Sequence, residues 1–174
     1  PREGERDGIE YFFKTKEEVE TMIENDEFLE YARYVDNYYG TPRFYVEEML
    51  AKGKNVILEI EIQGAMQIKA KNPEAVLVFV TPPSFEELRN RLVGRGTETA
   101  DVIESRLRRA SEEAEGMPSY DYILVNDTIS NTLSRFAQII HSNRYSRNCM
   151  KEFLDSYIDG EVKPHVQSYK EALL

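Results

Sequence analysis

Two acidic side chains stand at the end of an otherwise apolar stretch. Glu59 and Glu61 lie within the segment 56–62, which is aliphatic at most other positions. Side chains alternate along a strand, so two acids spaced by two residues point to the same face and need partners there. A divalent cation with a donor-rich ligand at the strand end would supply them. A strand end that turns into solvent would also accommodate them, and the spacing leaves both interpretations open.

Three arginines could bind phosphate groups. Arg91 and Arg95 are four residues apart, which places them on neighbouring turns of one helix, and Arg106 follows in a charged stretch. The planar guanidinium fits phosphate oxygens, and several arginines closing over a transferring phosphoryl group would stabilise its charge. The alternative is a solvated helix face whose arginines pair with the many neighbouring glutamates.

Other polar side chains could also contact a ligand. Arg2 and the tyrosine hydroxyls could bind a phosphate, and Glu30 could accept two N–H donors from a planar base. Aromatic residues in strands more often contribute packing than ligand contacts. Each of these residues therefore also has a purely structural interpretation.

Composition limits the class of protein. The chain has 174 residues, of which 41% are hydrophobic, enough for one well-packed domain, or for one domain with short mobile subdomains. The net charge of -10 argues against a sequence-independent nucleic-acid binder. No apolar run approaches the length that a bilayer needs, and the first residues are charged, so we expect a cytoplasmic protein. The single cysteine, Cys149, excludes an internal disulfide.

Helices and strands are expected to alternate along the chain. In the first third we predict a strand at 9–13, a capped helix at 15–24, a mixed aromatic segment at 28–35, a turn at 37–42 and a second helix at 42–51. Further along we predict an apolar strand at 56–62 that carries the two acids, and strands of the kind buried on both faces at 76–80 and 120–126. Helices are predicted between and after these strands, at 64–71, 84–92, 101–115 and 133–140. Such alternation predicts right-handed crossovers and an open parallel α/β sheet.

Six segments occur in a family's characteristic order, and together they resemble guanylate kinase over residues 1–144. Any one of them is a weak signal, whereas six in order are specific. They are Pro1-Arg-Glu-Gly-Glu5 followed by Tyr11, Asn37-Tyr-Tyr-Gly-Thr41, Ile57-Leu-Glu-Ile-Glu-Ile-Gln-Gly64, Thr81-Pro-Pro-Ser84, Arg91-Leu-Val-Gly-Arg-Gly-Thr-Glu-Thr99 and Tyr120-Asp-Tyr-Ile-Leu-Val-Asn-Asp127.

The resemblance implies an α/β fold with the parallel-sheet core of a P-loop nucleoside monophosphate kinase, truncated at its N-terminus. It implies a GMP-binding subdomain at 1–42, a core at 43–83 and 118–145, a helical lid at 84–117 and a C-terminal helical extension at 146–174. The implied activity transfers the γ-phosphoryl group of ATP to GMP, giving ADP and GDP with Mg²⁺, in purine nucleotide metabolism. The implied partners are GMP and ATP, not nucleic acid or a membrane, and homo-oligomerisation is left open.

The same resemblance implies roles for individual residues. The GMP phosphate would be held by Arg2, Tyr11 and Tyr39 with Glu5 in support, and guanine would be recognised by Glu30, Thr41 and Glu61. Glu59 would lie near Mg²⁺ and act through water, because Mg²⁺ keeps part of its hydration shell. The catalytic residues would be Arg91, Arg95 and Arg106, and the ATP site would comprise Arg91, Arg95 and Asn126.

Two departures from the family pattern bear on activity. Glu59 and Glu61 occupy strand-end positions where aspartate is familiar in the family. No Gly-x-x-x-x-Gly-Lys-Ser/Thr motif occurs in these residues, and the family places that phosphate loop just before the point where this sequence begins. Without that loop the β- and γ-phosphates of ATP have no cradle, so we expect residues 1–174 alone to be inactive or nearly so.

Two other functions remain as alternatives. A guanylate-kinase-like interaction module would keep the fold and bind a protein without phosphotransfer; the missing phosphate loop favours it, whereas the arginines and the GMP-binding residues favour the enzyme. A kinase for another nucleotide is disfavoured by the acidic set that would recognise guanine.

Overall fold

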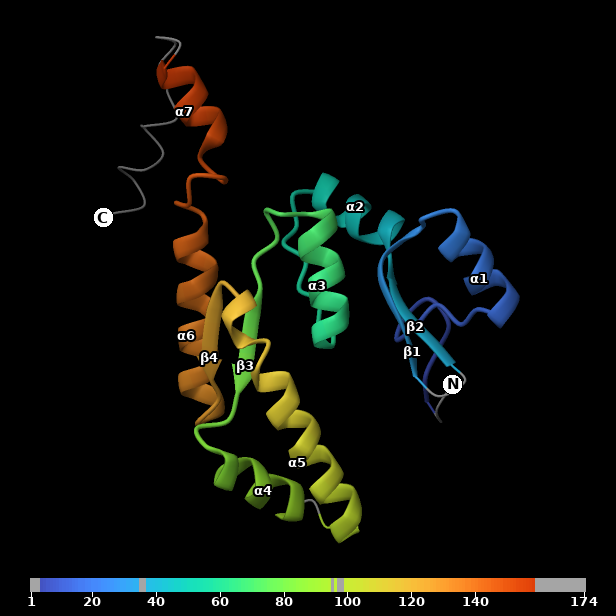
Figure 1. Ribbon diagram of the computed structural model, residues 1–174. Coiled ribbons are helices and arrows are strands. Elements are labelled where there is room, and N and C mark those ends of the chain that lie inside the picture. Colours follow the sequence, from blue (N-terminus) through green and yellow to red (C-terminus); the bar gives the residue numbers. More distant parts are fainter. Residues whose placement is uncertain (1–3, 35–36, 95, 97–98, 159–174) are drawn as a thin grey trace. The chain divides into compact units, whose positions relative to one another are not determined.

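The computed structural model describes residues 4–34, 37–94, 96 and 99–158 of the 174-residue chain (Figure 1). The chain divides into two compact units, Pro1–Ala75 and Val76–Leu174. No helix among the described residues is long and apolar enough to cross a membrane. The finer division into subdomain, core, lid and extension stays a prediction.

The first unit combines a two-stranded antiparallel sheet with three helices. Its elements are α1 (Lys16–Glu24), β1 (Phe28–Tyr34), β2 (Asn37–Pro42), α2 (Arg43–Ala51) and α3 (Ile62–Lys71). The two strands pair in a register that sets Glu30 opposite Thr41, with an irregularity between Phe28 and Glu30. A small core of Leu29, Val46 and Ile68 joins β1, α2 and α3.

The start of α1 confirms the expected capping box. Thr15 accepts a hydrogen bond from the Glu18 backbone N–H at 3.2 Å, and the Glu18 carboxylate accepts one from the Thr15 backbone N–H at 2.7 Å. These reciprocal bonds satisfy backbone donors that the helix itself leaves without partners. The bond from Thr15 is also the main reason why the pKa of Glu18 is lowered.

The segment 37–42, expected as a turn, is the strand β2, so this prediction is wrong. Tyr38 and Tyr39 suit a pleated strand, and the backbone pairs with β1 along its length. Gly40 is required by close packing, because a Cβ there would lie 2.8 Å from the Glu30 carbonyl oxygen. Pro42 ends the strand and is the N-cap residue of α2, a place where proline's missing N–H is tolerated.

Two further strands expected in this unit do not form within the described residues. Residues 9–13 form only an isolated bridge between Asp7 and Tyr11, because local turns use their backbone groups, as in the bond from Gly8 N to Tyr11 O at 2.7 Å. Residues 56–60 alternate in exposure as expected, with Val56, Leu58 and Ile60 packed on the core. A strand needs a backbone partner, however, and none is found here among the residues described.

The second unit contains a parallel strand pair and five helical elements. They are β3 (Val78–Thr81), α4 (Phe85–Gly94), α5 (Ala100–Ala114), the short 3₁₀ helix η1 (Met117–Ser119), β4 (Tyr122–Val125), α6 (Ile129–Asn143) and α7 (Lys151–Ile158). Strands β3 and β4 pair in parallel from Val78 opposite Tyr122 to Thr81 opposite Val125. This pairing confirms the expected parallel connection through intervening helices.

Burial of β3 and β4 on both faces was expected and is not observed. Leu77 and Leu124 are buried, but Val80 is 54% exposed and Ile123 is 47% exposed. The described part of the sheet has two strands, and side chains alternate across it, so one set of side chains stays accessible. Helix α5 buries no residue and packs against α4.

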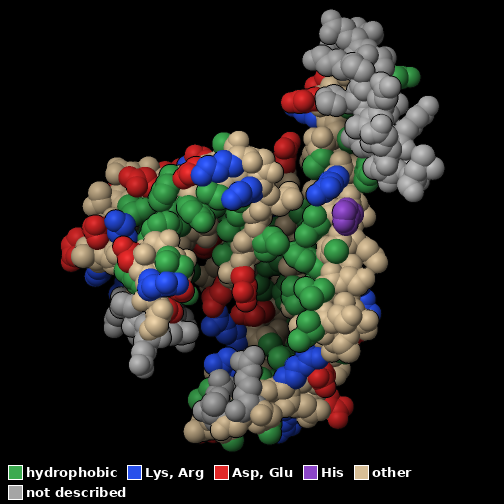
Figure 2. Space-filling model, turned by 180° about the vertical axis from the view of Figure 1, so that it is seen from behind, with side chains coloured by type: hydrophobic (Ala, Val, Ile, Leu, Met, Phe, Trp, Pro, Cys, Tyr) green, Lys and Arg blue, Asp and Glu red, His purple; other side chains and the backbone are tan. Residues whose placement is uncertain are grey.

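Charged side chains of both signs are interspersed on the face of the molecule seen in Figure 2. Independently of that view, several exposed ion pairs join residues four apart along the chain, including Lys14–Glu18, Lys16–Glu20 and Arg109–Glu113. Such exposed pairs contribute little to stability. For these residues, the charged helix faces are solvated surfaces with paired charges.

Candidate nucleotide-binding sites

The first candidate site is built around a buried carboxylate. Glu30 is 6% exposed, and the Thr41 hydroxyl donates a hydrogen bond to its Oε1 at 2.6 Å. Strand pairing brings these two residues together, because they are register partners on β1 and β2. A buried acid with one oxygen fixed in this way can present its remaining acceptor capacity to a ligand that carries N–H donors.

Helix α3 lies along β1 and forms the wall beside Glu30. Gln67 binds the backbone of Tyr31 twice, donating from Nε2 to the carbonyl at 2.9 Å and accepting from the N–H at Oε1 at 3.2 Å. Lys71 donates to the Phe28 carbonyl at 2.8 Å. Gly64 lies one turn before Gln67 and has Glu30 Oε2 beside it. The spacing 64, 67 and 71 places these residues on one face of the helix.

A cluster of three charged residues lies just before β1 and links it to α2 and α3. Asp26 binds Lys71 at 2.7 Å and Arg43 at 2.8 Å. The hydrogen bond from Lys71 is the main cause that lowers the pKa of Asp26, with Arg43 contributing as well. The cluster joins the residues before β1 to the first residue of α2 and the last residue of α3.

Two tyrosines expected at the GMP phosphate lie together. The rings of Tyr11 and Tyr39 meet edge to face with centroids 6.4 Å apart, and they are 49% and 51% exposed. Their phenol groups are thus accessible to a ligand. Glu5 is half-buried. Arg2, expected in the same group, lies outside the described residues.

Glu59 and Glu61, expected at the end of a strand that does not form, are both exposed. Glu61 is the N-cap residue of α3, and its carbonyl accepts the bond from Ala65 N at 3.0 Å. Glu59 precedes it on the same exposed side. Among the described residues, no group of three or more histidine, cysteine, aspartate or glutamate side chains could hold a metal ion.

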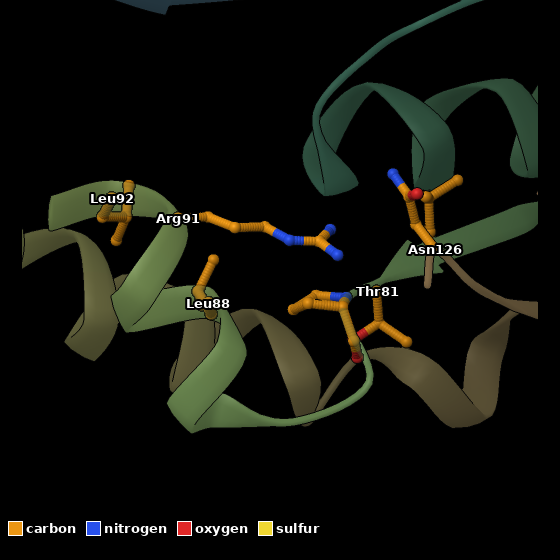
Figure 3. Close-up of a pocket in the computed structure, with 7 residues that line it drawn as sticks. Thr81, Leu88, Arg91, Leu92 and Asn126 are labelled. Atoms are coloured by element: carbon orange, nitrogen blue, oxygen red, sulfur yellow. The ribbon is translucent and has the colours of Figure 1, made fainter. Parts of the chain in front are cut away.

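The second candidate site is a pocket in the second unit, at the carboxyl ends of β3 and β4 (Figure 3). Its volume is about 200 Å³, smaller than the ~300–1,000 Å³ of pockets that enclose a whole ligand. The lining residues are Val80, Thr81, Pro82, Leu88, Arg91, Leu92 and Asn126. Ligand sites of open parallel sheets lie at this edge.

Arg91 extends from α4 toward Thr81 and Asn126 in this pocket (Figure 3). Its Nε donates to Glu87 Oε1 at 2.7 Å, and its Nη2 donates to the Asp127 carbonyl at 3.2 Å. Glu87 on the same helix and Asp127 in the connection between β4 and α6 together hold the guanidinium plane, while the remaining N–H groups of its fork can bind a ligand.

The residues after β4 are held by a second network. The Asn126 side-chain oxygen lies 3.1 Å from the Thr132 hydroxyl, which also lies 2.7 Å from the Thr128 carbonyl. The pKa of Asp127 is lowered, first by the backbone N–H of Thr128 and then by the side chains of Arg135 and Asn131. Helix α6 thus positions the chain at the pocket's polar side.

The structure brings together some of the expected site residues. Glu30 meets Thr41, Tyr11 meets Tyr39, and Arg91 shares a pocket with Asn126. Arg106 is exposed on α5 and is not among the pocket-lining residues. Arg95 lies outside the described residues.

Several supporting residues were not expected from the sequence. They are Gly64, Gln67 and Thr132, together with the apolar pocket residues Leu88 and Leu92. The Gln-Gly signature included Gly64 but carried no role for it. Residue type alone gave no signal for Gln67, because its bonds join α3 to β1, or for Thr132, which bonds back to Asn126 and Thr128 near the start of its own helix.

Comparison with known proteins identifies the family. The family model described as guanylate kinase matches residues 1–143. The guanylate kinase of Bacillus anthracis is 50% identical over 160 residues, covering 92% of this chain and 78% of the relative. The guanylate kinase of Lactococcus lactis is 55% identical over 144 residues, covering 83% of this chain and 70% of the relative. The crystal structure of guanylate kinase from Anaplasma phagocytophilum superposes with a TM-score of 0.67 at 33% identity, covering 84% of this chain and 71% of that one. The chain belongs to the guanylate kinase family.

Proposed function

We propose that this protein transfers the γ-phosphoryl group of ATP to GMP, giving GDP and ADP. The observation that carries the proposal is the buried Glu30 carboxylate, bound on one oxygen by Thr41. Guanine offers N1–H and exocyclic N–H donors on one edge, and a carboxylate can accept both. Adenine presents a different edge and would leave the buried acid without partners, which is costly.

Other residues of the first unit would make the remaining contacts with GMP. Tyr11 and Tyr39, with Arg2 and with Glu5 in support, would hold the phosphate of GMP. Glu61 would assist Glu30 in recognising guanine from the first turn of α3. The exposed edge-to-face pair of tyrosines supports this assignment, because both phenol groups are accessible.

The ATP site would be the pocket at the ends of β3 and β4. Asn126 would line the adenine side, and Arg91 with Arg95 would bind the phosphates. Arg91, Arg95 and Arg106 would stabilise the charge that spreads over the phosphoryl group in the transition state. The fixed guanidinium of Arg91, with bonds to Glu87 and to the Asp127 carbonyl, supports the first of these roles.

The acids around Glu59 fit a magnesium ion carried by the nucleotide. Mg²⁺ is usually bound by one or two carboxylates together with substrate phosphates and water, and an exposed Glu59 meets that requirement. When bound, the ion would neutralise charge on the phosphates. We place the reaction in the cytoplasm.

Calorimetric titration with GMP, AMP and UMP tests the proposal. We expect binding of GMP well above that of the other two nucleotides. The change Glu30→Ala should reduce GMP affinity roughly a hundredfold, since it removes a charged acceptor from two donors. The control is Glu47→Ala, which changes an exposed glutamate of α2. Unchanged GMP affinity in Glu30→Ala would contradict the guanine assignment.

GDP formation from GMP and ATP tests the catalytic part separately. Nucleotide binding is measured separately, so that binding and turnover are assessed independently. A protein that binds neither GMP nor ATP but captures a protein ligand would support the interaction-module alternative.

A further inference from the structure

Helix α3 carries a glycine where helix geometry does not require one. Gly64 is the third residue of α3 and is buried. It is not one of the glycines with positive φ, which are Gly4, Gly8, Gly53 and Gly96 among the described residues. Alanine is the better helix former, so the backbone gives no reason for glycine here. The reason must lie in its surroundings.

The side chain of Glu30 lies directly beside Gly64. A Cβ added at Gly64 would lie 2.6 Å from Glu30 Oε2, 3.1 Å from Cδ and 3.4 Å from Cγ, and these are its three nearest atoms. On its other oxygen Glu30 accepts the bond from Thr41 at 2.6 Å. The carboxylate is therefore held between the Thr41 hydroxyl and the backbone of α3.

We infer that Gly64 is a positioning residue for guanine recognition, because its missing side chain lets the Glu30 carboxylate lie where it can accept the N–H donors of the base. The inference rests on the proposed function. A methyl group at this position would displace the end of a flexible side chain, not a backbone segment, so the fold should tolerate it. The effect would fall on the orientation of the carboxylate and hence on discrimination between purines.

The two hydrogen bonds between Gln67 and Tyr31 determine how the protein can accommodate a methyl group at Gly64. Because Gln67 binds both backbone groups of Tyr31, α3 is tied to the residue that follows Glu30. The helix cannot simply move away from β1 to make room for a methyl group without breaking those bonds. The carboxylate must move instead.

The test compares Gly64→Ala with Gly94→Ala. Gly94 is also a helical glycine, in α4, but an added Cβ there would meet nothing within 4 Å. Dissociation constants for GMP and for inosine monophosphate, which lacks the exocyclic amino group, are measured by calorimetry. In Gly64→Ala the preference for GMP should fall roughly tenfold to a hundredfold. It should be unchanged in Gly94→Ala, and the thermal midpoint of both variants should stay near that of the parent protein.

Shortening the acid gives a second, independent measurement. If Gly64→Ala acts through Glu30, then Glu30→Asp should weaken GMP binding less in the Gly64→Ala background than in the parent protein. Additive effects would overturn the inference, and so would a Gly64→Ala protein that fails to fold or that keeps its preference for GMP. A parent protein without preference for GMP would overturn the proposed function itself, and the inference with it.

Discussion

Thr41 donates a 2.6 Å hydrogen bond to Oε1 of Glu30, its register partner on the neighbouring strand. The strand pairing thus does two things at once: it builds the sheet of the first unit and fixes one oxygen of its buried acid. Polar pairs directly opposite each other on two strands interact at close range. The side chain that recognises the base in our proposal is therefore held by the sheet itself.

The first prediction concerns this bond. Thr41→Val keeps the shape of the side chain and removes the donor, so Glu30 loses the partner that orients it. We expect GMP affinity to fall by roughly tenfold, the effect of one hydrogen bond to a charged group. Calorimetry measures this change, and Thr21→Val on the exposed side of α1 serves as the control. Equal affinities in the two variants would argue that Thr41 does not orient the acid.

The second prediction concerns the attachment of α3 to β1. Gln67→Ala removes both bonds to the Tyr31 backbone and should lower the free energy of unfolding by about 2 kcal/mol. Gln63→Ala changes an exposed glutamine of the same helix and should leave it nearly unchanged. Urea-induced unfolding gives both values. If the two variants were equally stable, the bonds of Gln67 to the Tyr31 backbone would contribute nothing measurable to the free energy of unfolding.

The third prediction concerns Arg91. Arg91→Lys keeps the charge but loses the planar fork that binds Glu87 and the Asp127 carbonyl together. We expect affinity for a fluorescent ATP analogue to fall by about tenfold, with GMP binding unchanged. Arg89→Lys, at an exposed position of the same helix, is the matched control. A loss of GMP binding in Arg91→Lys would contradict its assignment to the ATP site.

The fourth prediction concerns pH. Lys71 above all, and also Arg43, holds the pKa of Asp26 below its ordinary value of 3.8. A carboxyl group whose pKa is lowered on folding stabilises the protein above the unfolded-state pKa, and this contribution is lost as pH falls through the folded-state pKa. Asp26→Asn should therefore be less stable than the parent protein near pH 7, and the difference should shrink as the pH falls below the ordinary aspartate pKa of 3.8.

Thermal unfolding at a series of pH values measures this difference. Asp155→Asn, at an exposed position of α7, is the control and should change stability only slightly. A difference for Asp26→Asn that persists undiminished in acid would show that the charge of Asp26 is not its cause.

Local sequence patterns predicted the features that depend on a few neighbouring residues. The Thr15–Glu18 capping box and the charged helix α5 formed as expected, because their determinants lie within one or two turns. The family and its order of motifs could also be identified from the sequence. In contrast, the turn expected at 37–42 is a strand, because Gly40 serves close packing against Glu30, ten residues earlier in the chain.

The residue types of the candidate site were determined by the sequence alone: an acid at 30, a hydroxyl at 41, an arginine at 91 and an amide at 126. Only the tertiary structure decided which of them meet and what holds them. Gly64 and Gly94 are both helical glycines, and no local pattern tells them apart. They differ because β1 passes beside one and open space surrounds the other, and such proximity arises only when segments distant in the chain pack together.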